Sequence, residues 1–278
     1  MCQLLGMNCA TPTDITFSFT GFAERGGGTD HHGDGWGIGF FEDRACRLFI
    51  DHQPAAQSPL AQMLTHYPIH SRNVIAHIRK ATFGDTRLEN CHPFLRELWG
   101  RHWLFAHNGH LENYAPALGG TYQPVGSTDS ERAFCALLEG LRQRFGAEPP
   151  SIETIFDALA ELAPPVCAHG TFNFLLSNGQ ALFAYATTRL QYVVREWPFG
   201  KARLLDADMD IDFAQHTQPG DRVAVIATEP LTCDEDWTAL ACGELVCFRN
   251  GQPVLRRLTL SAEQQAGVRA RAVTAADR

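Results

Sequence analysis

The spacing of apolar residues predicts two amphipathic helices in the middle of the chain. In residues 128–145 the apolar residues fall at helical spacing: Phe134, Leu137, Leu138, Leu141 and Phe145. Thr128 followed by Glu131 forms a capping box, which predicts that this helix begins just after Thr128 and places Asp129 in its exposed first turn. A second apolar stripe predicts a helix over 151–163, and Pro164 and Pro165 are expected to end it.

Runs typical of β-strands lie on both sides of these helices. On the N-terminal side they cover 36–41, 46–51, 73–79 and 102–107, and the first two are expected to form a hairpin. On the C-terminal side they cover 171–177, 181–187, 191–195, 222–228 and 244–249. Residues 3–22 suggest a strand, a loop and a short helix. The sequence has no repeat, low-complexity tract or linker, so it predicts one domain over 1–278 with a polar tail at about 270–278.

Composition narrows the classes of partner and location. The net charge is −8 and no basic run occurs, which argues against nucleic acid or an anionic membrane as the main partner. No signal-like segment and no apolar stretch of about 18 residues is present. The nine cysteines are scattered and include no C-x-x-C pair, which favours a reducing cytoplasm over disulfides or a zinc site.

Cys2 is the residue with the most distinctive chemistry. If Met1 is removed, the thiol and the free α-amine belong to the same residue. The α-amine has a pKa of about 8 and can accept a proton, while the thiolate is a strong nucleophile. A single residue could then supply both the nucleophile and the base. Taken alone, Cys2 could equally be a small, partly buried thiol at the start of a strand.

Four further patterns follow Cys2 in order along the chain. They are the glycine-spaced run 34–39, the H-x-R-x-A-T segment 77–82 with 90–94 after it, the H-N-G segment 107–113, and the T-D-x-E helix start within 127–131. With Cys2, this ordered set closely resembles the glutaminase domain of the class II glutamine amidotransferases. The glycine-rich stretch 25–35 and the run 96–100 are most similar to the small stand-alone bacterial members, the YafJ-like proteins.

This resemblance implies a fold and a set of roles. The fold is the α+β, four-layer αββα sandwich of N-terminal nucleophile hydrolases, in which two mostly antiparallel sheets lie between helices. In the family the cysteine is the nucleophile, the asparagine side chain and glycine N–H stabilise an oxyanion, and the arginine and aspartate hold the α-carboxylate and α-ammonium of the substrate. The matching positions are Cys2, Asn108 and Gly109 for catalysis, and Arg79, Thr82 and Asp129 for substrate binding, with Trp36, His77 and His107 as support.

Each of these residues also has an ordinary structural explanation. Arg79 could be a surface ion-pair partner, and Asn108-Gly109 is a common hairpin-turn dipeptide. Asp129 could simply be a carboxylate favoured by the helix dipole. Lys80 and Phe83 depart from the residues common in larger family members, which leaves the shape of the substrate pocket open.

The expected function is a cytoplasmic cysteine amidohydrolase that releases ammonia from the γ-amide of L-glutamine, with no metal and no organic cofactor. One alternative keeps the chemistry and takes a larger γ-glutamyl metabolite, as the ergothioneine-pathway hydrolases do. Another is a latent glutaminase subunit that works only with a separate synthase partner. The sequence does not choose an ammonia acceptor or an oligomeric state.

Overall fold

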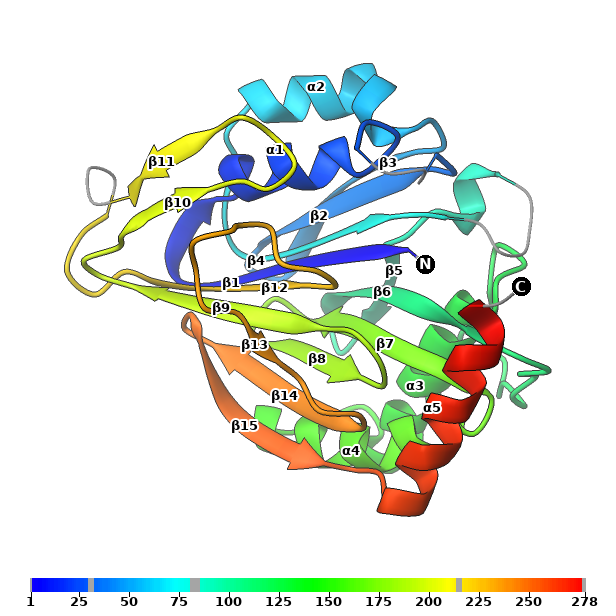
Figure 1. Ribbon diagram of the computed structural model, residues 1–278. Coiled ribbons are helices and arrows are strands. Elements are labelled where there is room, and N and C mark those ends of the chain that lie inside the picture. The colour runs from blue at the N-terminus through cyan, green and yellow to red at the C-terminus, as the bar shows by residue number, and fades with distance from the viewer. Residues whose placement is uncertain (1, 30–32, 81–85, 214–216, 277–278) are drawn as a thin grey trace.

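The computed structural model of the protein describes residues 2–29, 33–80, 86–213 and 217–276. Two antiparallel sheets lie face to face, with helices on the outer side of each (Figure 1). The helices α1 (Thr16–Glu24) and α2 (Pro59–His66) cover one sheet, and α3 (Asp129–Phe145), α4 (Ile152–Cys167) and α5 (Ala262–Ala276) cover the other. The expected four-layer αββα architecture is confirmed.

The first sheet has β1 (Gln3–Asp14) at its centre. Its strand order is β13 (Thr238–Ala239), β9 (Gln191–Glu196), β12 (Arg222–Ala227), β1, β4 (His70–Ile78), β2 (Trp36–Glu42) and β3 (Ala45–Asp51). The second sheet has the order β15 (Gln252–Leu258), β14 (Glu244–Arg249), β8 (Leu182–Ala186), β7 (Gly170–Ser177), β6 (Arg101–Leu111) and β5 (Phe94–Leu98). A small ribbon of β10 (Lys201–Arg203) and β11 (Asp210–Asp212) and two short 3₁₀ turns, Ala55–Gln57 and Leu88–Asn90, complete the elements.

The alternation of side chains along the strands builds three apolar layers. On β1, Leu5 and Met7 face α1 and α2, while Leu4 faces the space between the sheets. On β6, Phe105 packs with α3 and α4, while Leu104 belongs to the layer between the sheets. This arrangement brings the start of β1 and the ends of β4 and β6 to the same end of the sandwich.

Most of the expected elements are present close to their predicted positions. The hairpin of β2 and β3, the strands β4, β6, β7, β8, β9, β12 and β14, and the helix α3 are confirmed. The prediction that Pro164 and Pro165 end the second helix is wrong, because α4 continues to Cys167. Proline has a helical φ of its own, and Val166 and Cys167 are buried in the core beyond it.

The capping box is confirmed in only one of its two halves. Thr128 Oγ1 accepts a hydrogen bond from Glu131 N at 3.2 Å, as an N-cap should. The Glu131 carboxylate does not reach back to Thr128, and instead accepts from Arg96 and from the backbone N–H groups of Val125 and Gly126. Glu131 therefore organises the loop before α3 rather than only the first turn of the helix.

The spacing of apolar residues did not predict α2, β5, β15 or α5. The helix α5 includes residues 270–276 of the segment expected as a polar tail. In the part of the chain that the structure describes, none of the helices is long and apolar enough to cross a membrane.

Candidate functional site

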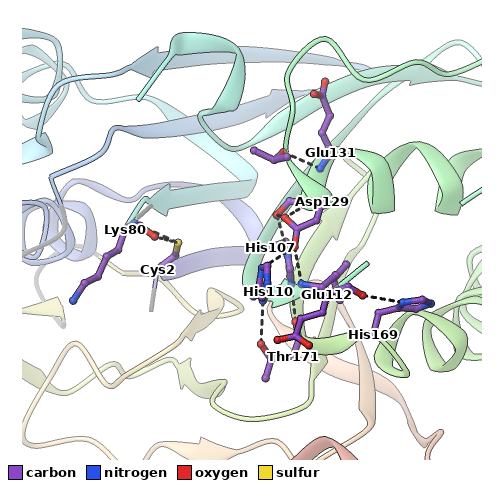
Figure 2. A network of polar contacts seen from close by, with 12 residues as sticks. Cys2, Lys80, His107, His110, Glu112, Asp129, Glu131, His169 and Thr171 are labelled. Atoms are coloured by element: carbon purple, nitrogen blue, oxygen red, sulfur yellow. Dashed lines mark hydrogen bonds and ion pairs between the residues drawn. The ribbon is translucent and has the colours of Figure 1, made fainter. Parts of the chain in front are cut away.

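Cys2 lies at the start of β1, and the residue as a whole is partly exposed. Gln3 pairs with Ile78 on β4, so the antiparallel register sets Cys2 beside the residues that follow β4. The Cys2 Sγ atom lies 3.3 Å from Lys80 N and 3.4 Å from Lys80 O (Figure 2). The backbone at the end of the neighbouring strand thus helps to fix the position of the sulfur.

Opposing influences act on the pKa of the Cys2 thiol. Burial is the largest and raises the pKa above that of an ordinary cysteine. The Lys80 N–H, the positive charge at the chain's N-terminus and the Arg79 guanidinium lower it, whereas the Asp129 carboxylate raises it. The net shift is upward, so the thiol is protonated at neutral pH and needs a base before it can attack an electrophile.

Arg79 comes directly after β4 and is only 3% exposed. Its backbone is clamped from both sides, because Arg79 N donates to Gly35 O at 2.8 Å and Asp34 N donates to Arg79 O at 3.3 Å. Gly35 has a φ of +105°, and a Cβ there would collide with Cys91 Sγ, so glycine is required for this clamp. The burial of Arg79 excludes the alternative of a surface ion pair.

Asn108 and Gly109 lie inside β6, which continues to Leu111, and they do not form a hairpin turn. They pair with Asn173 and Phe172 on β7. A Cβ at position 109 would collide with the backbone oxygen of Thr171, so any other residue there would force the two strands apart. The Asn108 Nδ2 atom lies 3.2 Å from Thr228 Oγ1, at the end of β12.

Asp129 and Ser130 at the start of α3 pack against the end of β6. Asp129 Oδ2 accepts from Leu111 N at 2.6 Å, and Asp129 Oδ1 accepts from Ser130 N at 2.8 Å. His110 Nδ1 lies 3.6 Å from Asp129 Oδ2 (Figure 2). The carboxylate is held by backbone donors at a helix N-terminus while its side chain stays 25% exposed, so it can still bind a cation.

His107 is buried beneath these residues and connects them through two hydrogen bonds. Its Nε2 donates to the carbonyl of Thr171 at 3.0 Å, so its Nδ1 accepts from Ser130 Oγ at 2.8 Å. Burial lowers the pKa of His107, although the nearby Asp129 charge acts in the opposite direction. His107 is therefore a neutral residue that joins β6, β7 and α3.

Two further buried histidines, His77 and His92, lie close to Arg79. His77 Nε2 bonds to the backbone oxygen of His107 at 3.1 Å, which links β4 to β6. The His92 ring packs against His77 in a tilted arrangement with centroids 4.1 Å apart, and it is 4% exposed. Burial, together with the charges of His77, His107 and Arg79, lowers the pKa of His92 far below that of a free imidazole.

The structure thus brings five of the six expected site residues to one end of the sandwich. The charges of Arg79 and Asp129 both act on the Cys2 thiol, and Asn108 and Gly109 lie near the end of β6, whose final residue, Leu111, donates to Asp129. Thr82, like Phe83 and Met1, lies outside the described residues. Sequence spacing did not single out Ser130 or Thr228, because each acts through a contact between distant segments. In the described ranges, no cluster of three or more His, Cys, Asp or Glu residues is suited to hold a metal ion.

A separate cavity of about 590 Å³ lies at the other end of β1, lined in part by Thr13, Phe17 and Phe213. Its buried cation, Arg195, already forms a two-pronged ion pair with Glu235. The cavity thus lies away from Cys2, and the charge of Arg195 is already compensated by Glu235.

Comparison with known proteins places this geometry in a family. The model of the family described as "Glutamine amidotransferases class-II" matches residues 1–271. YafJ of Escherichia coli K12 is 51% identical over 92% of this chain and 100% of its own length. A "predicted glutamine amidotransferase" from Pseudomonas aeruginosa has a solved structure with a TM-score of 0.74, at 43% identity over 91% of this chain and 100% of that one.

More distant structures support the fold alone. Glutamine phosphoribosylpyrophosphate amidotransferase from Bacillus subtilis is 15% identical and has a TM-score of 0.56, over 93% of this chain and 49% of that one. The fold of N-terminal nucleophile hydrolases is therefore shared well beyond the range of close sequence similarity. With a family model matched over nearly its full length and a relative at 51% identity, the chain belongs to the class II glutamine amidotransferases.

Proposed function

We propose that the protein is a cysteine amidohydrolase that releases ammonia from the γ-amide of L-glutamine through a γ-glutamyl thioester on Cys2. The mature enzyme begins at Cys2 after removal of Met1. The reaction takes place in the cytoplasm, an assignment supported by nine scattered cysteines with no C-x-x-C pair.

The α-amine of Cys2 acts as the base. Because burial raises the pKa of the thiol, little thiolate forms without help. The neutral α-amine takes the thiol proton as the sulfur attacks the amide carbon, and it passes the proton to the departing ammonia. A water molecule, activated by the same amine, then hydrolyses the thioester and releases glutamate.

Arg79 and Asp129 recognise the amino-acid end of the substrate. The Arg79 guanidinium pairs with the α-carboxylate, for which its planar fork is suited. The Asp129 carboxylate, held in place by Leu111 N and Ser130 N, binds the α-ammonium. Thr82 is proposed to add a hydrogen bond to the substrate. These contacts fix the reacting amide over the thiol.

Asn108 and Gly109 stabilise the tetrahedral intermediate. Its oxyanion accepts from the Asn108 side-chain amide and from the Gly109 N–H. Loss of one such donor typically lowers kcat by about 100- to 1000-fold. A side chain at position 109 would collide with Thr171 and His107, so the packing of β6 against β7 requires glycine there and fixes the place of its N–H.

The observation that carries this proposal is the contact of the Cys2 thiol with the backbone of Lys80, the residue directly after the buried Arg79. The test is release of ammonia and glutamate from L-glutamine by the purified protein, with its N-terminus verified by mass spectrometry. The Cys2→Ala variant should abolish release, while Cys233→Ala, which removes an exposed thiol elsewhere, should retain it. Undiminished release by Cys2→Ala would refute the assignment.

A second experiment identifies the nucleophile and the processing together. Treatment with diazo-oxo-norleucine, an alkylator that mimics glutamine, should add one adduct, and peptide mapping should place it on residue 2 at the N-terminus. An adduct on Cys233, or labelling that excess L-glutamine does not slow, would show that the reagent reacts as a general alkylator.

A further inference from the structure

The side-chain hydroxyl of Thr228 links the start of β1 to the end of β6. Leu5 pairs with Ala227, so Thr228 lies opposite Leu4, two residues from the nucleophile. Leu4 N donates to Thr228 Oγ1 at 2.9 Å, and the Asn108 side-chain amide contacts the same oxygen at 3.2 Å. Thr228 itself is only 2% exposed, so solvent does not compete for these contacts.

When Asn108 Nδ2 points toward Thr228, two buried polar groups at this contact lack a hydrogen-bond partner in the described residues. The Thr228 oxygen then receives two N–H donors, and its own hydrogen finds no acceptor among the described residues. Asn108 Oδ1 is also buried without a hydrogen-bond partner in the described part of the chain. A buried polar atom left unsatisfied costs about 1–3 kcal/mol, so two such groups side by side favour a rearrangement.

Rotating the Asn108 amide by half a turn corrects both defects. The two ends of an amide have nearly the same shape, so the rotation needs no additional space. Thr228 Oγ1 would then keep the N–H of Leu4 and donate its own hydrogen to Asn108 Oδ1. The backbone of Asn108 stays in place, since its carbonyl accepts from Asn173 Nδ2 at 2.9 Å.

We propose that Thr228 is a positioning residue that turns the amide N–H of Asn108 toward the reacting oxygen of the substrate. The inference rests on the proposed function, in which Asn108 is an oxyanion donor. With the opposite orientation an amide oxygen would face the developing negative charge and repel it. The hydroxyl of Thr228 selects the productive orientation, because only an acceptor can face its hydrogen. In the rotated orientation the side-chain N–H of Asn108 is available to donate to the oxyanion, as the reaction requires.

The first test compares three substitutions in the processed enzyme. Thr228→Val keeps the side-chain shape but removes the hydroxyl, and it should lower kcat for L-glutamine at least tenfold with KM changed less than threefold. Thr228→Ser should restore kcat to within about threefold of the wild type. The control is Thr232→Val, which removes a buried hydroxyl that bonds to Glu235 and Trp237 and should leave kcat unchanged.

The second test separates the Asn108 contact from the Leu4 contact. In an Asn108→Ala background, Thr228→Val should cause no further loss of kcat, because there is no amide left to orient. The alkylation rate of Cys2 by iodoacetamide should be the same in Thr228→Val and the wild type. A full additional loss in the Asn108→Ala background, or slowed alkylation, would show that Thr228 acts through β1 and would overturn the inference.

The outcomes also distinguish this inference from the proposed function. If Cys2→Ala abolishes ammonia release but Thr228→Val has wild-type kcat, the inference is wrong and the function stands. If Cys2→Ala releases ammonia normally, the proposed function fails first. Thermal unfolding of each variant, compared with Thr232→Val, identifies any loss of activity that comes from loss of folded protein.

Discussion

Gly109 illustrates how closely single residues in this site are constrained by their neighbours. Its α-carbon lies where a side chain would collide with the Thr171 carbonyl of β7 and with the His107 ring. Neither group can move away easily, because His107 Nε2 donates a hydrogen bond to Thr171 O. The N–H of Gly109 is therefore held at a fixed place at the end of β6.

Gly109→Ala should reduce both activity and stability. The added methyl forces β6 and β7 apart, which costs about 1–3 kcal/mol of folding free energy and displaces the oxyanion donor. We expect kcat to fall about 100-fold and the melting temperature to drop. Gly200→Ala is the matched control, because a Cβ at position 200 meets no atom within 4 Å. Wild-type kcat in Gly109→Ala would remove Gly109 from the site.

Asp129→Asn should selectively weaken recognition of the substrate's α-ammonium. The informative quantity is the ratio of kcat/KM for L-glutamine to that for its analogue without the α-amino group, because general damage to the site cancels in this ratio. A hydrogen bond to a charged group contributes about 1.5–3 kcal/mol, so the ratio should shrink by about 10- to 100-fold. An unchanged ratio would assign Asp129 a structural role at the start of α3 only.

At the scale of elements, the sequence predicted the strands that have an apolar face and the helix with a clear stripe. Edge strand β15 was not predicted, because most of its residues are at least partly exposed and it lacks a regular apolar alternation. The helix α2 was not predicted because it is short, with Ser58 as its N-cap and Pro59 as its first residue. The end of α4 was predicted wrongly, because Pro164 and Pro165 usually end a helix. Here the burial of Val166 and Cys167 outweighs that local preference.

The same reasoning explains which site residues could be predicted. Cys2, Arg79, Asn108, Gly109 and Asp129 belong to local motifs, so a resemblance to the family could place them. Thr228 has no motif of its own, and its role follows only from the register of β12 against β1. Glu131 was recognised as a helix-start residue, but its contact with Arg96 joins α3 to β5 and depends on the packing of the second sheet.

Glu131→Gln should destabilise the protein far more than an equivalent change at the surface. Glu131 is buried, and its carboxylate accepts from Arg96 and from two backbone N–H groups of the loop that leads to Asp129. Breaking a buried pair on one side costs about 3–5 kcal/mol, because the partner charge is left uncompensated. Asp157→Asn removes the partner of Arg257 in a half-exposed ion pair and should cost less than about 1 kcal/mol. Urea unfolding measures both, and equal effects would contradict the role assigned to Glu131.

For the whole molecule, the space between the sheets is an unusual place for polar rings. His77 crosses it to form a hydrogen bond with β6, His92 packs against His77, and His107 lies on the other side of β6 against α3. The pKa values of His92 and His107 are both lowered, chiefly by burial, so the folded protein keeps these rings neutral where an unfolded chain protonates them. The His92 and His107 rings beneath the site are thus neutral in the folded protein, and their burial makes the fold sensitive to acid.

The stability of the protein should therefore fall as the pH drops below about 6.5, the pKa of an unfolded histidine. Below that pH the unfolded chain binds protons that the folded state does not, so each of the two rings removes up to about 1.4 kcal/mol per pH unit until its lowered folded pKa is reached. His92→Phe keeps an aromatic ring against His77 and Phe94 and removes one of the two groups that titrate. The free energy of unfolding, measured with urea at pH 8, 6 and 5, should depend less steeply on pH in this variant. The difference should correspond to about one proton fewer taken up on unfolding. At pH 8 the variant should be at least as stable as the wild type, because neither ring nitrogen of His92 has a hydrogen-bond partner in the described residues. Identical slopes for the two proteins would mean that His92 takes up its proton in the folded state as readily as in the unfolded chain.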